Sequence, residues 1–339
     1  MRLRPKFICG AVLGASMFIT GCQSPALISA KLYLQEDQPE HAREQLLRAR
    51  EEAPDNPEVH YLLGKVYGME EDWKAMSESL ERSLELSSRY AADITQVRRH
   101  FWTQQYNAGV TLATAPAPDY VMANQAFKAA TTISPGEVAA WRNLGYTYYQ
   151  LGEMDAAIQT YGVAVEHAPE DTATVASLAT LCLQQSRYDL AAAALEQLVR
   201  LTPEDSEAWV NLGIVQQQLD KVEDAEYAYQ RALALNPDLY TAHFGLGNLY
   251  WNQERYGDAA EHYGAAVDLH PAAPEARFNL AMTYLQQGED RAALPLLEEL
   301  TRQTPDNGAV WSHLSLIYAR MDRLTDAQAA EARARELGH

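Results

Sequence analysis

Large and small apolar side chains recur along the chain in a fixed order. In one copy of this order, Leu144 and Gly145 are followed by Tyr148, and then by Ala157 and Tyr161. This arrangement predicts a pair of helices, because a small residue on each helix lets the two approach closely while large residues fill the remaining space. The order starts again at a constant interval and in uninterrupted register, at Val138, Thr172, Ser206, Tyr240, Pro274 and Gly308.

A proline closes each copy of the repeat. Since proline cannot continue a helix, each of these residues predicts a break between one helix pair and the next. A single pair buries too little surface by itself, so we expect successive pairs to stack and share a continuous core. The closing prolines recur at the same constant interval: Pro135, Pro169, Pro203, Pro237, Pro271 and Pro305.

The order of residue types within one repeat resembles a known family signature. Residues 141–148 read Trp-Arg-Asn-Leu-Gly-Tyr-Thr-Tyr, and Ala157, Tyr161, Ala164 and Pro169 follow at fixed offsets. This pattern resembles the tetratricopeptide repeat (TPR), which has Trp, Leu-Gly and Tyr on a first helix and Ala, an aromatic residue and Ala on a second, with a period of about 34 residues. The resemblance implies an all-α fold, a right-handed α-solenoid superhelix of about nine TPR helix pairs.

Three weaker copies of the repeat precede the six regular ones. One fits residues 23–56 and another begins at Pro57. A third, around residues 106–109, fits when its connection is lengthened, and the Ala-Pro-Ala-Pro stretch within residues 114–119 predicts such a loop. The last regular copy carries Glu331 where earlier copies carry Tyr or Leu. A polar outer face is typical of a capping repeat, so we expect the array to end with the chain.

Residues 91–101 do not fit the repeat and are interpreted as a long extension of the following helix. They include the basic cluster Arg-Arg-His at residues 98–100, for which a solvated helix face is favoured over a binding role. We expect this insertion to complete an N-terminal arm of two divergent repeats, residues 22–101. The regular superhelix would then occupy residues 102–339.

The first residues have the features of an export signal. Three basic residues precede an apolar run at residues 7–19, which is too short to span a bilayer, and the run leads into Ile-Thr-Gly-Cys. This sequence resembles the bacterial lipoprotein lipobox. The resemblance implies removal of residues 1–21 and acylation of Cys22, with palmitate among the attached chains. Because Gln23 is not Asp, the usual sorting pattern points to the outer membrane, facing the periplasm.

Two other interpretations of the leader remain open. It could be an ordinary secretion signal in which Cys22 is incidental. The chain could also be a cytoplasmic TPR co-chaperone whose N-terminus is not a signal at all; an intact Met1 without lipid on Cys22 would indicate this case.

Composition narrows the possible partners. The formal net charge is −19, which argues against nucleic acid because phosphate binding needs clustered Lys and Arg. The acidity also argues against attachment to anionic lipid through a basic face, so membrane attachment would depend on the lipid anchor. Of the three cysteines, only Cys182 would be left without lipid after processing, so no intramolecular disulfide is expected.

No pattern of residues predicts catalysis. Phosphate-binding, zinc-protease and paired-cysteine motifs are absent from the sequence. His243, His262 and His270 share one repeat, with Asp258 one helical turn before His262, but ordinary surface or seam residues are favoured over a metal site. We therefore predict a protein that is not an enzyme and has no cofactor, no metal and no small-molecule substrate.

By analogy with TPR arrays, the first helices of the pairs should line a concave groove that binds a protein or peptide partner. Asparagine recurs at the sixth position of four repeats and is interrupted by Ser177, Gly245 and His313. It could hold a peptide backbone, or it could form a local hydrogen bond between helices. The predicted groove residues are Tyr106, Asn107, Arg142, Asn143, Tyr146, Tyr149, Asn211, Ile214, Phe244, Asn248, Trp251, Phe278, Asn279 and Met282.

The predicted function is therefore a membrane-anchored TPR scaffold that binds segments of partner proteins. The resemblance is to TPR lipoproteins of Gram-negative envelopes, of the pilus-assembly and outer-membrane assembly type, and it implies a role in envelope complex assembly. The alternative is a regulatory protein that recruits an envelope hydrolase or transferase in trans. A fold of this class does not by itself name the partner.

Overall fold

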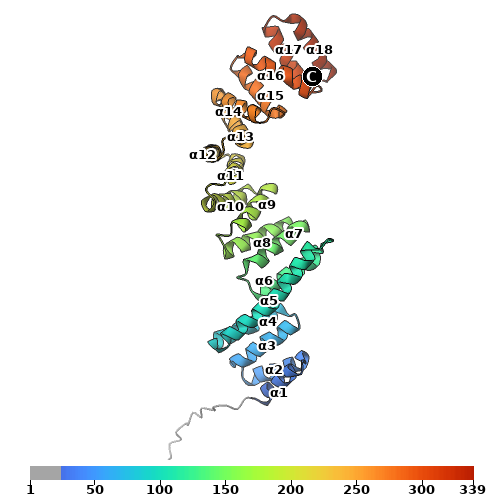
Figure 1. Ribbon diagram of the computed structural model, residues 1–339, viewed down its shortest axis with the longest axis vertical. Helices are drawn as coiled ribbons and strands as arrows, with labels where there is room; N and C mark the ends of the chain where they lie inside the picture. Colours follow the sequence, from blue (N-terminus) through green and yellow to red (C-terminus); the bar gives the residue numbers. More distant parts are fainter. Residues whose placement is uncertain (1–23) are drawn as a thin grey trace, which may run out of the picture. The chain divides into compact units, whose positions relative to one another are not determined.

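The computed structural model describes residues 24–339 and is entirely helical over that range (Figure 1). The predicted signal peptide, Cys22 and Gln23 lie outside the described residues. Within them, 18 α-helices and one short 3-10 helix follow one another without a strand, which confirms the predicted all-α repeat fold of nine helix pairs. No helix in the described part of the chain is long and apolar enough to cross a membrane.

The chain divides into two compact units, residues 1–140 and 141–339. The division predicted after residue 101 falls inside α5 and stays a prediction. The described helices of the first unit are α1 (Pro25–Gln35), α2 (Pro39–Glu52), α3 (Pro57–Met69), α4 (Trp73–Leu86), η1 (Ser88–Tyr90), α5 (Ala91–Thr114) and α6 (Tyr120–Ile133).

Helix α5 is much longer than its neighbours. It has 24 residues, whereas the other first helices of the unit, α1 and α3, have 11 and 13. The insertion is thus a helical extension, as the sequence predicts. The Ala-Pro-Ala-Pro stretch forms the loop before α6, and Asp119 caps that helix by accepting a hydrogen bond from the backbone N–H of Met122 at 3.0 Å.

The regular repeats begin where the sequence predicts. Each of the six predicted first residues is also the first residue of a helix. The helices are α7 (Val138–Gln150), which contains the boundary between the units, α8 (Met154–His167), α9 (Thr172–Gln184), α10 (Tyr188–Leu201), α11 (Ser206–Gln218), α12 (Val222–Leu235), α13 (Tyr240–Asn252), α14 (Tyr256–Leu269), α15 (Pro274–Gln286), α16 (Asp290–Gln303), α17 (Gly308–Arg320) and α18 (Leu324–Glu336).

A glycine on the first helix of a pair lets a tyrosine of the second helix lie against its backbone. A methyl group added at Gly213 would lie 2.7 Å from the Tyr229 ring, and one added at Gly247 would lie 2.6 Å from the Tyr263 ring. Both tyrosines are almost fully buried. The small-and-large pairing predicted from the sequence is therefore a direct contact between the two helices.

The turn inside each regular pair uses a left-handed residue. Gly152 and Gly288 have φ values of 78° and 77°, which glycine adopts without a steric clash because it has no Cβ atom. At the equivalent place in other repeats the chain uses Ser186, Asp220, Glu254 and Asp322, with φ between 54° and 59°.

Successive pairs are also joined through the carbonyl of the closing proline. Trp209 Nε1 donates to the Pro203 carbonyl at 3.0 Å, and Arg277 donates to the Pro271 carbonyl at 2.6 Å. In the repeat at Thr172, whose fourth position is valine, Gln197 Nε2 donates to the Pro169 carbonyl at 2.6 Å instead. The proline thus ends one repeat and supplies a hydrogen-bond acceptor to the next.

Candidate peptide-binding face

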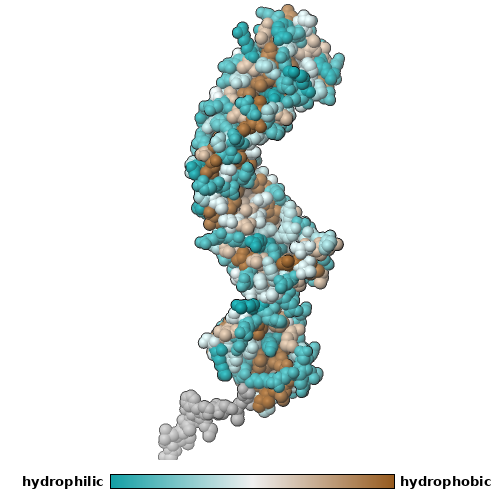
Figure 2. All heavy atoms as spheres, viewed as in Figure 1, coloured by the Kyte–Doolittle hydropathy of each residue, from teal (hydrophilic) through white to brown (hydrophobic). Residues whose placement is uncertain are grey.

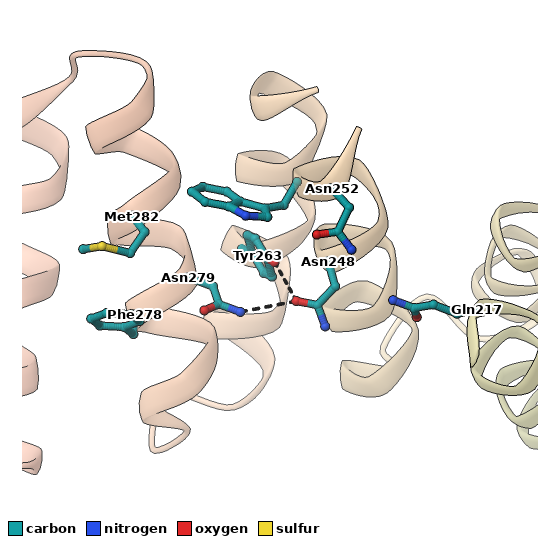
Figure 3. Close-up of a pocket in the computed structure, with 8 residues that line it drawn as sticks. Gln217, Asn248, Asn252, Tyr263, Phe278, Asn279 and Met282 are labelled. Carbon is teal, nitrogen blue, oxygen red and sulfur yellow. Dashed lines mark hydrogen bonds between the residues drawn. The ribbon is translucent and has the colours of Figure 1, made fainter. Parts of the chain in front are cut away.

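The first helices of three successive repeats in the second unit line a pocket of about 390 Å³ (Figure 3). We call the surface formed by the first helices of the second unit the first-helix face. One further lining residue comes from a second helix, α14. The lining residues are Gln217, Asn248, Trp251, Asn252, Tyr263, Phe278, Asn279 and Met282.

The polar side of this pocket is a small network of amides around one phenol. Asn248 Oδ1 accepts a hydrogen bond from the Tyr263 hydroxyl at 2.6 Å and another from Asn279 Nδ2 at 3.3 Å (Figure 3). Burial raises the pKa of Tyr263 to about 12, so the hydroxyl keeps its proton and remains a donor at neutral pH. An amide has an oxygen and a nitrogen, so Asn248 keeps its Nδ2 donor and Asn279 its Oδ1 acceptor for another molecule.

The apolar side of the pocket consists of three large side chains. Trp251 packs at the edge of one core cluster, and Phe278 and Met282 pack at the edge of the next. All three are half-buried, which fixes one side of each while the other side lines the pocket. Methionine adapts to differently shaped partners because it is flexible and polarisable. The pocket therefore offers apolar contact next to amide hydrogen bonds.

A second pocket lies on the same face near the start of the second unit. Its volume is about 370 Å³, and Tyr146 and Tyr149 at its edge are 41% and 36% exposed. Tyr161 also lines it beside Ser177, whose hydroxyl donates to the Ala173 carbonyl at 2.8 Å. Burial raises the pKa of Tyr161, while Ser177 and Arg142 act to lower it. The lining residues are Tyr146, Tyr149, Tyr161, Ala176, Ser177, Thr180, Leu181 and Gln184.

The structure gives the sixth repeat position a role in stacking. There, Asn279 Nδ2 donates to Asn248 Oδ1 of the preceding pair at 3.3 Å. Where the sixth position is Gly245, a methyl group would lie 2.5 Å from the ring of Tyr229. Asn279 is thus a local hydrogen-bond partner, and Gly245 interrupts the asparagines because the Tyr229 ring occupies the space that a side chain would need.

The structure brings seven of the predicted groove residues to the two pockets: Asn248, Trp251, Phe278, Asn279 and Met282 to the first, and Tyr146 and Tyr149 to the second.

Other predicted groove residues in the second unit line neither of these pockets. Arg142 pairs with Asp171 at 3.1 Å, across the start of α9. Ile214 and Phe244 pack against the core cluster of their own repeats, and Asn143 and Asn211 are half-buried.

Two predicted groove residues belong to the first unit. Tyr106 on α5 stacks on Trp102, with ring centroids 4.7 Å apart, and its neighbour Asn107 is exposed. They are therefore not part of either pocket on the first-helix face.

Three residues of the first pocket were missed by the sequence analysis. Gln217 occupies the same repeat position as Tyr149 and Trp251, so the repeat register contained a usable signal for it. Asn252 directly follows Trp251. Tyr263 occupies the same repeat position as Tyr161, where the sequence predicts only a large residue that fills space between helices, but its hydroxyl also reaches the pocket.

Cys182 lies outside both pockets, and so do the histidines His243 and His262. Cys182 is a free, fully buried thiol, and burial raises its pKa. His243 and His262 are hydrogen-bonded through their Nδ1 atoms at 3.0 Å. The described residues contain no group of three or more His, Cys, Asp or Glu side chains that could hold a metal ion.

Comparison with known families agrees with this architecture. A family model described as a tetratricopeptide repeat matches residues 117–182 and 250–317, and a second model with the same description matches residues 177–240. Together these matches span more than half of the chain. The chain therefore belongs to the tetratricopeptide-repeat proteins.

Several solved structures are similar to parts of this chain. The MamA protein is 22% identical with a TM-score of 0.47, over 51% of this chain and 94% of its own. YrrB, described as a TPR protein with an unusual peptide-binding site, is 21% identical with a TM-score of 0.48, over 55% and 96%. A TPR protein from Parabacteroides merdae ATCC 43184 is 18% identical with a TM-score of 0.48, over 70% and 93%. No curated protein matches the chain.

Proposed function

We propose that this TPR protein is a non-catalytic scaffold that binds segments of partner proteins on its first-helix face. The observation that carries the proposal is the pocket of about 390 Å³, where three apolar side chains lie beside four amide side chains on three successive first helices. Pockets that combine an apolar lining with a few placed polar groups are typical of binding sites.

The chemistry of this pocket favours an extended peptide or one face of a helix. Trp251, Phe278 and Met282 would contact an apolar side chain of the partner. Asn248 and Asn279 would hydrogen-bond its peptide groups, which is recognition that does not depend on the partner's sequence. Specificity would then come from the shape of the apolar part and from the second pocket near Tyr146.

We further propose that lipid on Cys22 anchors the scaffold to a membrane of the cell envelope. The lipobox pattern of the leader supports this proposal. Several acyl chains on one residue would give stable attachment, because each buried methylene contributes about 0.8 kcal/mol. Gln23 after the anchor favours the outer membrane, facing the periplasm, and supporting the assembly of an envelope complex is the role that fits such a place.

The peptide-binding part is tested by placing a photo-reactive benzoyl-phenylalanine at Met282 and irradiating cells. The matched control carries the same group at Tyr227, which is 58% exposed on α12 and lines neither pocket. We expect one partner to be crosslinked from Met282 and not from Tyr227. Asn252 is an exposed amide of the pocket. Replacing it by alanine in the Met282-labelled protein should reduce this crosslink about three- to tenfold, as expected for the loss of one hydrogen bond to the partner.

Equal crosslinking from both positions would contradict a binding site on the first-helix face. Capture of a stoichiometric hydrolase or transferase would favour the recruiting role over structural assembly. The anchor is tested separately by metabolic labelling with palmitate and by membrane fractionation. Label that persists in a Cys22→Ala variant would refute acylation at this residue, and co-fractionation with the inner membrane would refute the sorting prediction.

A further inference from the structure

Helix α1 carries an exposed apolar stripe. Ile28 is 48% exposed and Leu32 is 54% exposed, and Pro25 at the start of the helix is exposed as well. These residues are three and four positions apart, so they lie on one face of the helix. We call this stripe the α1 end face. Figure 2 shows hydrophobic side chains at the end of the chain that contains α1.

The repeat register explains why this face is apolar. Pro25 and Leu32 stand one full repeat before Val59 and Val66 of α3, which are 1% and 0% exposed. Val59 and Val66 are buried because the preceding pair, α1 and α2, packs against them in one core cluster. The α1 end face therefore has the composition of a surface that receives a neighbour.

The same two positions are buried in the later repeats. The third position holds Ala208, Ala242, Ala276 and Val310, and the tenth holds Val215, Leu249, Thr283 and Ile317, none more than 3% exposed. By contrast, the outer helix of the last pair, α18, exposes one large hydrophobic side chain, Leu324 at its first residue, and carries ion pairs such as Arg333 with Glu336 at 2.9 Å. The α1 end face is therefore apolar, whereas the outer surface of α18 carries charged side chains in ion pairs.

We propose that the α1 end face lies against the lipid bilayer, in the headgroup region, and so sets how the scaffold sits on the membrane. This inference rests on the proposed lipid anchor at Cys22. Ser24 already caps α1, accepting a hydrogen bond from the Leu27 N–H at 3.2 Å. Only Gln23 would separate the acylated residue from this cap. At about 3.3–3.6 Å per residue, Pro25 would lie within about 11 Å of Cys22.

A small apolar face is enough for such a contact because the anchor holds it in place. A stable protein interface buries about 1,200 Å² or more, which two half-exposed side chains and a proline do not approach. Contact with a bilayer to which the chain is already attached is intramolecular, so its effective concentration is high. The net charge of −19 also opposes a second copy of the chain, whereas a zwitterionic lipid surface does not repel the protein.

The contact can be measured with a fluorescent probe at Leu32. In the lipidated chain, Leu32→Cys is labelled with an environment-sensitive nitrobenzoxadiazole dye; Cys182 is fully buried, and acylated Cys22 does not react. The control places the same dye at Leu190→Cys, 44% exposed on α10. Both proteins are reconstituted into phosphatidylcholine vesicles, with and without spin-labelled lipid as a quencher. We expect a blue-shifted, quenched emission from the dye at Leu32 and a water-like, unquenched emission at Leu190.

The outcomes separate this inference from the proposed anchor. A chain that floats with the vesicles but gives water-like emission at Leu32 retains its anchor and overturns the inference. A chain that carries no lipid and does not float refutes the anchor, and the inference falls with it. A blue shift that appears without vesicles and grows with protein concentration would mean that a second copy covers the face, which also overturns the inference. An Ile28→Ser variant should reduce the quenching at Leu32 without releasing the chain from the vesicles.

Discussion

At the scale of single residues, the two helices of a pair pack closely because a glycine on one helix contacts a tyrosine ring on the other. At Gly213 an added methyl group would overlap the Tyr229 ring, so the ring or the backbone would have to shift. At Gly264, on the outside of α14, an added methyl group meets nothing within 4 Å. The two positions therefore make opposite predictions for the same substitution.

We expect Gly213→Ala to lower the free energy of unfolding by about 1–3 kcal/mol, because the ring must move off the helix. Gly264→Ala should raise it by about 0.5–1 kcal/mol, since alanine favours an exposed helix more than glycine does. Equilibrium urea unfolding followed by circular dichroism measures both. A neutral Gly213→Ala would mean that the helix pair is packed less closely than the structure indicates.

At this scale the sequence predicts which residue types meet, but not every contact. The pairing of Gly247 with Tyr263 follows from the repeat register alone. That Asn279 of the next pair reaches Asn248, which already accepts from the Tyr263 hydroxyl, depends on how far each pair is rotated relative to the previous one, and no pattern of residue types encodes this rotation. Gln217 could have been found, because the register places it with Trp251.

At the scale of helices, the starts of the regular pairs were predictable because prolines punctuate them. The hydrogen bonds to the proline carbonyls were not. Trp209, His243 and Arg277 share no chemical type beyond an N–H group, and a carbonyl accepts from any of them. The length of helix α5 was also predictable, because residues 91–101 contain no proline or glycine that would end the helix.

One of these junctions should respond to pH. His243 bonds to the Pro237 carbonyl through Nε2 at 3.0 Å, so Nε2 carries the proton and Nδ1 accepts from His262 Nδ1. Burial, and then the neighbouring His243, lower the pKa of His262, while Glu261, Asp258 and Glu226 act to raise it. The neutral form of His262 is therefore the one that the folded state favours.

We expect the free energy of unfolding to decrease as pH falls below the ordinary histidine pKa of about 6.5, because the unfolded chain then binds protons that the folded chain resists. The pKa of His313 is also lowered by burial and should add to the effect. His262→Gln should reduce the slope of stability between pH 7 and pH 5, and adding His313→Gln should reduce it further. An unchanged slope in the double variant would assign the pH dependence to other groups.

At the scale of the molecule, stability is a sum over stacked pairs, and the last pair has a special place in that sum. Leu297 and Leu300 on α16 are buried in a cluster that includes Val310 and Leu314 of α17. Removing α17 and α18 would uncover this surface, whereas the outer side of α18 bears Glu331 and Arg335 in an ion pair.

A chain truncated after Thr304 should therefore lose stability and associate at concentrations where the full chain does not. Sedimentation velocity measures the association and thermal unfolding the stability. Leu297→Ala in the full chain is the control: it should cost about 2–5 kcal/mol by leaving a cavity, without exposing a new apolar face. If the truncated chain stays dispersed, α17 and α18 do not protect the array from association.

The even spacing of the regular pairs also has a mechanical meaning. The six regular repeats begin at a constant interval, and the junctions between them are made in a similar way, by stacked side chains and a hydrogen bond to a proline carbonyl. If a membrane held the protein at one end and a bound partner applied a pulling force, the helix pairs would unfold one at a time. Each pair, drawn out at about 3.4 Å per residue, would add about 115 Å of chain. Such a scaffold could lengthen under load in equal steps while its remaining pairs stay folded.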